Sequence, residues 1–349
     1  MDTKKNEQLT PSKIMHVGMG FWASKALLAA VNFKLFSMLA EGGKKGREIK
    51  EILHFNAMER QVYDWLDVLV SLGFLKREKL LEEAVYTNSE ETDFFLDTKK
   101  PSYMGGILQM ANNRLYHHWA NLEEGLLTGK SQNESKAGSN MEFFEELYKS
   151  PEKLQEFMDA MSGIQGGNFM ALVNKFDFGK YKTLADIGGA DGFLSCMIAK
   201  KYPAITCTTF DLPPVAPLAK NKIDKFHLAD RINVASGDFI KDPIPSAEII
   251  TMGNILHGIN EETKMLVIKK VYEALPENGV FMTIENIIDP ERKNNTFGLL
   301  MSLNMLIENG DGFDYTQNDF DTWTKKAGFK RTEVIPLAGP TSAAIAYKN

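Results

Sequence analysis

The sequence predicts an α/β protein of two domains, the second built around a parallel sheet with helices on both faces. Two observations lead to this fold class. Apolar residues recur every three or four positions over most of residues 1–130, whereas short apolar runs alternate with helical segments over residues 181–349. A length of 349 residues also suits about two domains. We therefore expect an N-terminal helical domain over 1–130, a linker with connecting helices over 131–180, and the α/β domain over 181–349.

The first domain is predicted to contain helices followed by a small hairpin. Residues 13–39 carry apolar side chains on more than one helical face, so we expect this helix to be buried on several sides, in part against a second subunit. Helical segments follow at 47–53 and 58–72, and the apolar stretches 74–77 and 84–87 can pair as a hairpin. This order of elements is typical of a winged helix.

A winged helix has two common uses, DNA binding and subunit pairing. The segment 58–72 would be the recognition helix, but its charged residues are three acids and one arginine, namely Glu59, Arg60, Asp64 and Asp67. Contacts to DNA phosphates need lysine and arginine. The sequence therefore favours a dimerisation module. A net charge of −6 without long basic runs predicts neither a nucleic-acid partner nor an anionic membrane partner.

The N-terminus is polar and lacks the apolar core of a signal peptide, and no apolar run approaches the length of about 18 residues that a membrane span needs. Cys196 and Cys207 fall in apolar segments, as expected for buried free thiols in a reducing compartment. We therefore expect a cytoplasmic protein. His117 and His118 are adjacent, and adjacent helical residues point in different directions, so no metal site is predicted there.

Five short apolar runs in the second domain are predicted to be parallel strands, at 183–187, 205–210, 232–235, 248–252 and 280–284. Helical segments such as 193–200 and 261–275 lie between them. The carboxyl ends of parallel strands meet at one edge of a sheet, where such folds bind their ligands. Each of the five runs is followed by an ionisable or glycine-rich stretch, so we expect a ligand site at that edge.

The first strand ends at Asp186 and is followed by three glycines, Gly188, Gly189 and Gly192. Glycine lets the backbone turn tightly and approach a ligand closely. A dinucleotide-binding turn has the spacing G-x-G-x-x-G, but counting from Gly188 its third position is Phe193. An acid two residues before the first glycine resembles motif I of the class I S-adenosylmethionine (SAM) methyltransferases instead. The alternatives are a nicotinamide or flavin cofactor and a purely structural turn.

Further groups that suit SAM follow the next strands. Asp211 lies 19 residues after the last glycine of the turn, and an acid at that place can accept both ribose hydroxyls. Gly237, Asp238 and Phe239 offer an acceptor for an adenine amino group and a ring that packs against the base. Leu212 and Asn254, which lie beside the ends of the second and fourth strands, complete the expected cofactor-binding set.

His257 follows the fourth strand and is the candidate general base. A histidine of near-neutral pKa can take the proton of a substrate hydroxyl as that oxygen attacks a methyl carbon. Glu285, at the end of the fifth strand, is expected to hold the other imidazole nitrogen and to favour the imidazolium. The alternative is a histidine that caps a helix or is satisfied within the core.

These motifs together resemble the SAM-dependent O-methyltransferase family that includes the caffeate, acetylserotonin, hydroxyneurosporene and many antibiotic-pathway methyltransferases. The matching segments cover nearly the whole chain. They are Phe21-Trp22-x-Ser24-Lys25-Ala26, Leu69-Val70-x-Leu72-Gly73-Phe74-Leu75, Asp186-Ile-Gly-Gly, Phe210-Asp211-Leu212-Pro213, Gly237-Asp238-Phe239, Ile255-Leu256-His257 and Thr316-x-x-Asp319-Phe320.

The resemblance implies a winged-helix-like N-terminal domain that forms a homodimer, and a Rossmann-like, seven-stranded SAM-binding domain whose last strand, 343–347, is antiparallel. It implies SAM as the methyl donor, S-adenosylhomocysteine as its product, and no metal. In the family the catalytic histidine matches His257, and its flanking carboxylates match Glu285 and Asp314. Positions that line the acceptor match Met305 and Asn309, with Trp119 and His257 as further expected contacts.

The chain departs from the family pattern beside its histidine, where His-Asp-Trp is replaced by His257-Gly258-Ile259. Ala190 also replaces a common glycine. The leading hypothesis is O-methylation of a small hydroxylated molecule. The alternatives are methylation of a thioether sulfur, as in methylthiohydroxybutyrate, or of nitrogen or carbon on the same fold, and a non-catalytic SAM-binding regulator. The motifs do not specify the acceptor.

Overall fold

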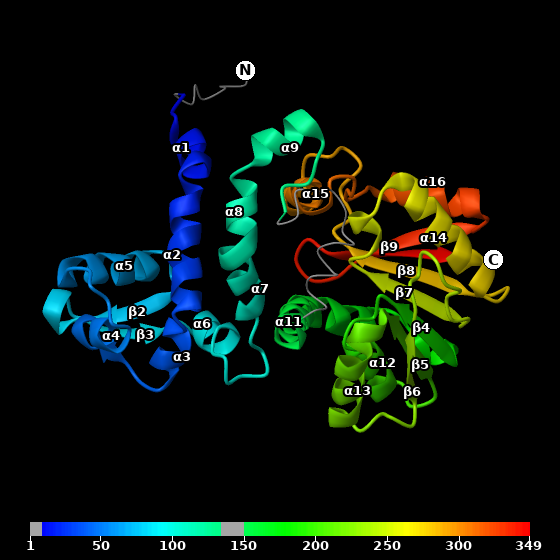
Figure 1. The fold of residues 1–349 in the computed structure, drawn as a ribbon, viewed down its shortest axis with the longest axis horizontal. Coiled ribbons are helices and arrows are strands. Elements are labelled where there is room, and N and C mark those ends of the chain that lie inside the picture. The colour runs from blue at the N-terminus through cyan, green and yellow to red at the C-terminus, as the bar shows by residue number, and fades with distance from the viewer. Residues whose placement is uncertain (1–8, 134–149) are drawn as a thin grey trace, which may run out of the picture. The chain divides into compact units, whose positions relative to one another are not determined.

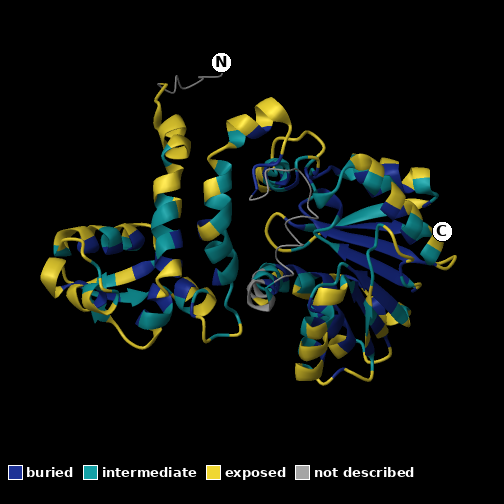
Figure 2. Cartoon of the chain, in the orientation of Figure 1, coloured by how far each residue is buried: buried dark blue, intermediate teal, exposed yellow. Residues whose placement is uncertain are grey.

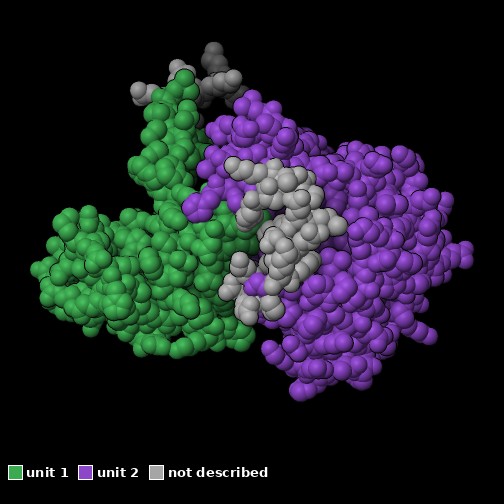
Figure 3. Space-filling model, in the orientation of Figure 1, with its two compact units in different colours: residues 1–116 green, residues 117–349 purple. Residues whose placement is uncertain are grey.

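The structure is a computed structural model that describes residues 9–133 and 150–349. The chain forms two compact units, which are coloured separately in Figure 3. Unit 1 is Met1–Tyr116 and unit 2 is His117–Asn349, so the boundary lies at residue 116 rather than at the expected 130. Residues 134–149 of the expected linker lie outside the described part of the chain. Residues 151–175 of that linker are a helix of unit 2, because their apolar side chains join its core.

Unit 1 combines helices with a small antiparallel sheet (Figure 1). Its helices are α1 (Ser12–Gly18), α2 (Gly20–Asn32), α3 (Leu35–Ala40), α4 (Gly46–Ile52), α5 (Glu59–Ser71), α6 (Glu90–Phe95) and α7 (Gly105–Met110), which continues into the π-helical turn η2 (Ala111–Leu115). Its strands are β1 (Lys44–Lys45), β2 (Leu75–Glu78) and β3 (Val85–Asn88), in the order β1-β3-β2. Helices followed by a hairpin are the arrangement that the sequence predicts.

The core of unit 1 follows from the helical period of its sequence. In α5, Val62, Leu66 and Leu69 recur at spacings of four and three and are all buried. They pack with Leu35 and Phe36 of α3 in one apolar cluster. The small domain is therefore held by its own core.

Helix α1 and the start of α2 are exposed (Figure 2), and several of the exposed residues are large and apolar. Ile14, Val17, Phe21 and Trp22 are all at least half exposed. By length and composition alone, the stretch Ser12–Asn32 is long and apolar enough to cross a membrane, with a mean hydropathy of 1.4, which differs from the sequence expectation of no such run. The core helix of a soluble protein and a signal sequence near an N-terminus pass the same test, so one such helix is weak evidence for a span.

Unit 2 is organised around a seven-stranded sheet of order β6-β5-β4-β7-β8-β10-β9. Its strands are β4 (Thr183–Ile187), β5 (Thr206–Asp211), β6 (Ile232–Ser236), β7 (Ile249–Gly253), β8 (Val280–Glu285), β9 (Arg331–Pro336) and β10 (Ser342–Tyr347). The first five strands run parallel, and β10 is antiparallel to both β8 and β9. The expected Rossmann-like sheet with an antiparallel last strand is confirmed.

The sheet is covered on both faces because its strands are apolar on both sides. In β4, Leu184 packs with one apolar cluster and Ala185 with the other. Helices α11 (Pro151–Lys175), α12 (Phe193–Lys201) and α13 (Ala216–Lys225) lie on the first face; α14 (Glu261–Ala274) and α16 (Gln317–Ala327) lie on the second. Within residues 117–133 and 150–349, further α-helices are α9 (Leu122–Thr128), α15 (Thr296–Asn309) and most of α8 (Tyr116–Trp119), which begins at the last residue of unit 1.

Candidate active site

The loop after β4 turns tightly at its glycines, and each one is required for a local reason. Gly188 has a φ of +66°, and a Cβ there would lie 2.4 Å from the Cδ1 atom of Ile255. A Cβ on Gly189 would lie 2.3 Å from Oγ1 of Thr209, and Gly192 has a φ of +76°. The turn is therefore packed against the segment that leads into His257, two residues after Ile255.

Asp186 lies at the carboxyl end of β4 and is almost completely buried. Its Oδ1 atom accepts a 2.7 Å hydrogen bond from the hydroxyl of Thr251 on the neighbouring strand β7. Burial raises the pKa of Asp186 to about 7, although the Thr251 hydrogen bond acts the other way. One hydrogen bond offsets little of the free-energy cost of burying a carboxylate charge. A cationic ligand, such as the SAM ammonium, would therefore stabilise the ionised form of Asp186.

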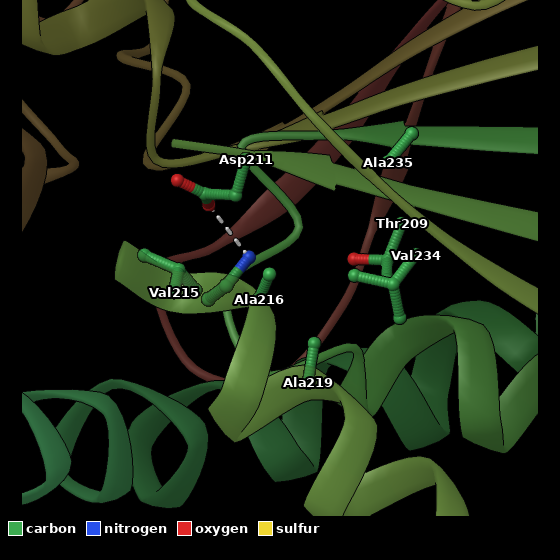
Figure 4. Close-up of a pocket in the computed structure, with 8 residues that line it drawn as sticks. Thr209, Asp211, Val215, Ala216, Ala219, Val234 and Ala235 are labelled. Atoms are coloured by element: carbon green, nitrogen blue, oxygen red, sulfur yellow. Dashed lines mark hydrogen bonds between the residues drawn. The ribbon is translucent and has the colours of Figure 1, made fainter. Parts of the chain in front are cut away.

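Asp211 ends β5, and two backbone amides orient its carboxylate. Ala190 donates to Oδ2 at 2.9 Å, which is the dashed line in Figure 4, and Leu212 donates to Oδ1 at 2.7 Å. A small hollow beside it is lined by Val215, Ala219 and other small apolar residues. The expected ribose acceptor is therefore fixed in place at the carboxyl edge of the sheet.

The loop after β6 carries the residues expected to meet adenine. A Cβ on Gly237 would lie 2.7 Å from the ring of Phe210, so the backbone passes close to that ring. Asp238 accepts from the Ile240 amide at 2.9 Å and pairs with Lys241 at 3.1 Å. Phe239 is half-buried in the apolar cluster of this face. The expected adenine contacts thus come together in one loop.

The catalytic candidates form a buried cluster at the same edge. His257 belongs to the short 3₁₀-helix η5 (Leu256–Gly258), which follows β7, and Glu285 ends the adjacent β8. Asn254, one turn earlier, has a left-handed φ of 53°. The exposed fraction is 7% for His257, 0% for Glu285 and 2% for Asp314. Water therefore screens the charges of this cluster poorly.

The structure corrects the expected role of Glu285. Its Oε1 atom accepts the amides of Ile255, Leu256 and His257 at 3.0, 2.7 and 3.3 Å, and no hydrogen bond to the imidazole is found among the described residues. The reason is local, because the first turn of η5 directs three amides at the end of β8. Glu285 thus holds the backbone that carries His257 rather than the imidazole itself.

Asp314 is the carboxylate that faces the imidazole, with Oδ1 3.4 Å from His257 Nδ1. Burial alone lowers the pKa of His257, but the contact with Asp314 and the charges of Glu285 and Asp314 outweigh it and raise the pKa above its usual value. The loop of Asp314 is tightly packed, since a Cβ on Gly312 would lie 2.7 Å from the carbonyl oxygen of His257. The imidazole is therefore both oriented and made more basic.

Helix α15 brings the expected acceptor residues beside this cluster. Met305 and Asn309 are buried on it, and the Asn309 amide donates to the Gly258 carbonyl at 3.1 Å, so this side chain also braces the histidine segment. Trp119 of α8 donates from Nε1 to Asn304 Oδ1 at 2.8 Å. The three expected residues thus gather around α15.

One buried acid of the glycine loop was not assigned a role from the sequence. Asp191 accepts from Ser162 of α11 at 2.8 Å and from Lys222 of α13 at 2.7 Å, and it caps the start of α12 through the Phe193 amide at 3.2 Å. Its place two residues before the start of α12 was the available signal. Within the described ranges, no group of three or more His, Cys, Asp or Glu side chains could hold a metal ion.

Comparison with known proteins agrees with this site. Residues 119–330 match the O-methyltransferase domain, and residues 15–98 match the O-methyltransferase dimerisation domain. The chain is 34% identical over 338 residues to "Tetracenomycin polyketide synthesis 8-O-methyl transferase TcmO" of Streptomyces glaucescens, covering 97% of both chains. The chain belongs to the O-methyltransferase family. It is a SAM-dependent methyltransferase, and its N-terminal domain matches the module that pairs subunits in a homodimer.

Two further proteins show how widely the family fold is shared. "N,N-dimethyltransferase OxyT" of Streptomyces rimosus is 28% identical over 317 residues, with 91% of this chain and 90% of that protein covered. The crystal structure of human N-acetylserotonin methyltransferase in complex with SAM superposes with a TM-score of 0.88 at 26% identity and covers 100% of both chains.

Proposed function

We propose that this O-methyltransferase transfers a methyl group to a hydroxyl of a small molecule, with His257 taking the hydroxyl proton. The observation that carries the proposal is the buried contact of 3.4 Å between His257 Nδ1 and Asp314 Oδ1 at the carboxyl edge of the sheet. A neutral hydroxyl is a weak nucleophile near neutral pH, and a base of near-neutral pKa activates it.

We infer that Asp314 also sets the tautomer of the base by accepting a hydrogen bond from Nδ1 in the working enzyme; in this structure the two atoms are in ion-pair contact at 3.4 Å, without a hydrogen bond. A carboxylate accepts a hydrogen bond from Nδ1 only when Nδ1 carries the proton, which leaves Nε2 free to accept one. When Nε2 takes the substrate proton, the charges of Asp314 and Glu285 stabilise the imidazolium. Glu285 contributes a second time by holding the backbone of His257 through Oε1.

The residues at the sheet edge fit SAM, which supplies an activated methyl group when bound. We assign its amino-acid part to Asp186 and the turn of Gly188, Gly189 and Gly192, since that turn has no room for side chains at its first two glycines. We assign the ribose to Asp211. Leu212, Gly237, Asp238 and Phe239 then hold the adenine, and Asn254, which follows β7 next to β4, completes the cofactor-binding set.

For the acceptor we propose a phenolic hydroxyl on an aromatic molecule. Met305 of α15 provides an apolar, polarisable contact surface, and the indole of Trp119 lies against the same helix through Asn304. Asn309 is placed at the end of this surface nearest to His257. The relative TcmO is named for 8-O-methylation in polyketide synthesis, which supports an oxygen acceptor.

Methylation of an amine nitrogen is the second candidate, because OxyT is named as an N,N-dimethyltransferase. An unprotonated amine is already nucleophilic and needs no base before it attacks. A thioether sulfur likewise has no proton to lose. The dependence of the reaction on His257 therefore separates a hydroxyl acceptor from both of these.

We further propose that the enzyme acts as a homodimer in the cytoplasm without a nucleic-acid or membrane partner. The free thiols Cys196 and Cys207 are both buried, as in proteins of reducing compartments. In α5, Arg60 pairs with Asp64 of the same helix at 3.0 Å, so the arginine that would meet a DNA phosphate is already partnered.

The proposal is tested by offering methyl-labelled SAM with pooled phenols, hydroxy acids, amines and thioethers, and by identifying labelled products with mass spectrometry. We expect label on a phenolic oxygen. With that acceptor, His257→Gln is expected to lower kcat by about 10²–10⁴-fold while SAM binding persists. The exposed His54, whose φ of 53° asparagine tolerates, supplies the matched control His54→Asn with unchanged activity. Label on nitrogen or sulfur alone, or full activity of His257→Gln, would reject the proposal.

A further inference from the structure

A completely buried lysine lies beside the His257 cluster. Lys264 belongs to α14 and has an exposed fraction of 0%. It occupies the core face of this helix, because Val267, Ile268 and Val271 follow it at spacings of three, four and seven and are also fully buried. Lysine is almost never fully buried unless its charge is compensated. The surroundings of Lys264 therefore need a specific explanation.

Lys264 connects two segments that meet at His257. Its Nζ atom donates to the carbonyl oxygen of Ile259 at 2.5 Å, just beyond η5. The same atom lies 3.4 Å from the ring centroid of Phe313, which precedes Asp314, and 5.7 Å from that of Trp323. A cation over an aromatic face is attracted to it, most strongly where water is excluded. Lys264 thus braces the loop that presents Asp314 to the imidazole.

The charges that act on Lys264 are those of the same cluster. Burial lowers the pKa of Lys264 to about 8, whereas Glu285, Asp314, Asp311 and Glu261 act to raise it. In return, the ammonium of Lys264 acts to lower the pKa of His257, against Asp314 and Glu285. Lys264 and His257 therefore act on each other electrostatically, and the charges of Glu285 and Asp314 act on both.

We propose that Lys264 is a positioning residue for methyl transfer, whose buried ammonium braces the Phe313–Asp314 loop and balances the charge of the His257 cluster. When His257 takes the substrate proton, the cluster gains one positive charge. Asp314 and Glu285 favour that gain, and the ammonium of Lys264 opposes it. Without Lys264 this opposition is lost, and His257 would hold its proton too tightly to act as a base at neutral pH.

This inference rests on the proposed role of His257 as the base, so its test separates the two. The imidazole of His257 is followed by NMR in histidine-labelled enzyme, and its signal is assigned by its loss in His257→Gln. In Lys264→Met, we expect the titration midpoint of His257 to rise by about one pH unit. The acid limb of the kcat/KM profile should rise by the same amount, which a merely structural role of Lys264 would not cause.

Lys348→Met is the matched control. Lys348 also donates to backbone carbonyls of α14 and its C-terminal end, those of Tyr272 and Leu275 at 2.7 and 2.6 Å, and it lies 4.3 Å from the ring centroid of Tyr272. It makes the same kinds of contact without acting on His257. Lys348→Met should lower the thermal midpoint of unfolding and leave the titration of His257 unchanged.

Each outcome bears on one of the two proposals. An unchanged His257 midpoint in Lys264→Met that still binds S-adenosylhomocysteine overturns the role of Lys264. If the titration midpoint of His257 rises in Lys264→Met but the acid limb of the kcat/KM profile does not move, the role of Lys264 stands and His257 is rejected as the base. If Lys264→Met does not fold, the wild-type enzyme decides the question by ¹³C NMR of labelled lysine. The proposal requires Lys264 to stay charged over the pH range in which His257 titrates. A titration midpoint of Lys264 below that of His257 overturns it.

Discussion

Two buried carboxylates act on His257 in different ways. Asp314 lies 3.4 Å from Nδ1 of the imidazole, so in our proposal it governs both the tautomer and the charge of the base. Glu285 accepts three backbone amides of η5 and reaches the imidazole only through its charge. The two side chains are chemically alike, so their isosteric amides separate orientation from electrostatics.

Asp314→Asn is expected to lower kcat by about 10³-fold, because an amide that donates to Nδ1 selects the wrong tautomer. Glu285→Gln keeps an oxygen for the η5 amides and loses only the charge, so its loss of kcat should be much smaller. Both carboxylates raise the pKa of His257, so either change should move the acid limb of the kcat/KM profile to lower pH. Equal losses of kcat in the two variants would contradict the assignment.

The raised pKa of His257 also has a consequence for stability. A group whose pKa is raised by folding stabilises the protein while it is protonated in both states, and this contribution is lost as the pH rises through the folded pKa. The protonated imidazole therefore stabilises the fold below its usual pKa of about 6.5. At pH values below its pKa, His257 is protonated and contributes most to stability. At pH values above its pKa, it is neutral and can act as a base.

The sequence identified the residues of this cluster but not how they interact. Asp314, Glu285 and His257 come from three segments that only the fold brings together, and the direction of a side chain at a strand end is not encoded by spacing. Glu285 was expected at the imidazole because the sequence does not show that the backbone amides of η5 point toward its carboxylate. The burial of Lys264 could have been predicted from the sequence, because this lysine stands at a position of α14 that shares the face of its apolar residues.

At the scale of elements, the glycine loop after β4 contains one residue that does not suit its backbone. Ala190 has a left-handed φ of 50°, which costs a non-glycine residue about 1–2 kcal/mol. Its amide donates to Asp211, so the conformation is coupled to the orientation of the ribose acceptor. The loop thus keeps a strained alanine at a position where the conformation suits glycine.

Ala190→Gly should relieve that strain and keep the amide that Asp211 accepts. The expected gain in the free energy of unfolding is about 0.5–1 kcal/mol, after the entropy that glycine adds to the unfolded chain. Urea unfolding at a fixed protein concentration measures it. The control is Ala199→Gly in α12, where the residue is buried and helical and the same change should cost about 1 kcal/mol. A loss of stability in Ala190→Gly would show that the loop is not strained.

Strands with strong apolar runs were predictable at this scale, and β9 was not. The predicted 183–187 coincides with β4, and 280–284 falls one residue short of β8. Strand β9 lies at the edge of the sheet and mixes Arg331, Thr332 and Glu333 with apolar residues, so it carries no continuous apolar run. The order of the strands decides which strand ends are neighbours, and that order is seen only in the fold.

At the scale of the whole molecule, the match to a dimerisation domain explains the exposed apolar helices of unit 1. The sequence predicted that residues 13–39 would be apolar on several faces and would meet a second subunit. Unit 1 itself contains a groove of about 490 Å³ between α2 and α5, lined by Met19, Trp22, Trp65 and Val68 among others. An apolar groove of this size is typical of a surface that another chain covers.

Trp22→Glu should therefore separate the subunits. Trp22 is 63% exposed within its own chain, and large aromatic residues dominate the binding energy of interfaces, so a buried charge there is expected to weaken pairing by at least about 30-fold. Light scattering after size-exclusion chromatography measures the mass at several concentrations, and circular dichroism verifies the fold.

The matched control is Leu266→Glu, the same kind of change at a leucine that is 46% exposed on α14 of unit 2. It should leave the dimer intact, because Leu266 lies outside the residues that match the dimerisation domain. A dimer that survives Trp22→Glu at every concentration would mean that the subunits pair through another surface. Dissociation by both variants would mean that added negative charge, rather than loss of the α2 surface, drives the subunits apart.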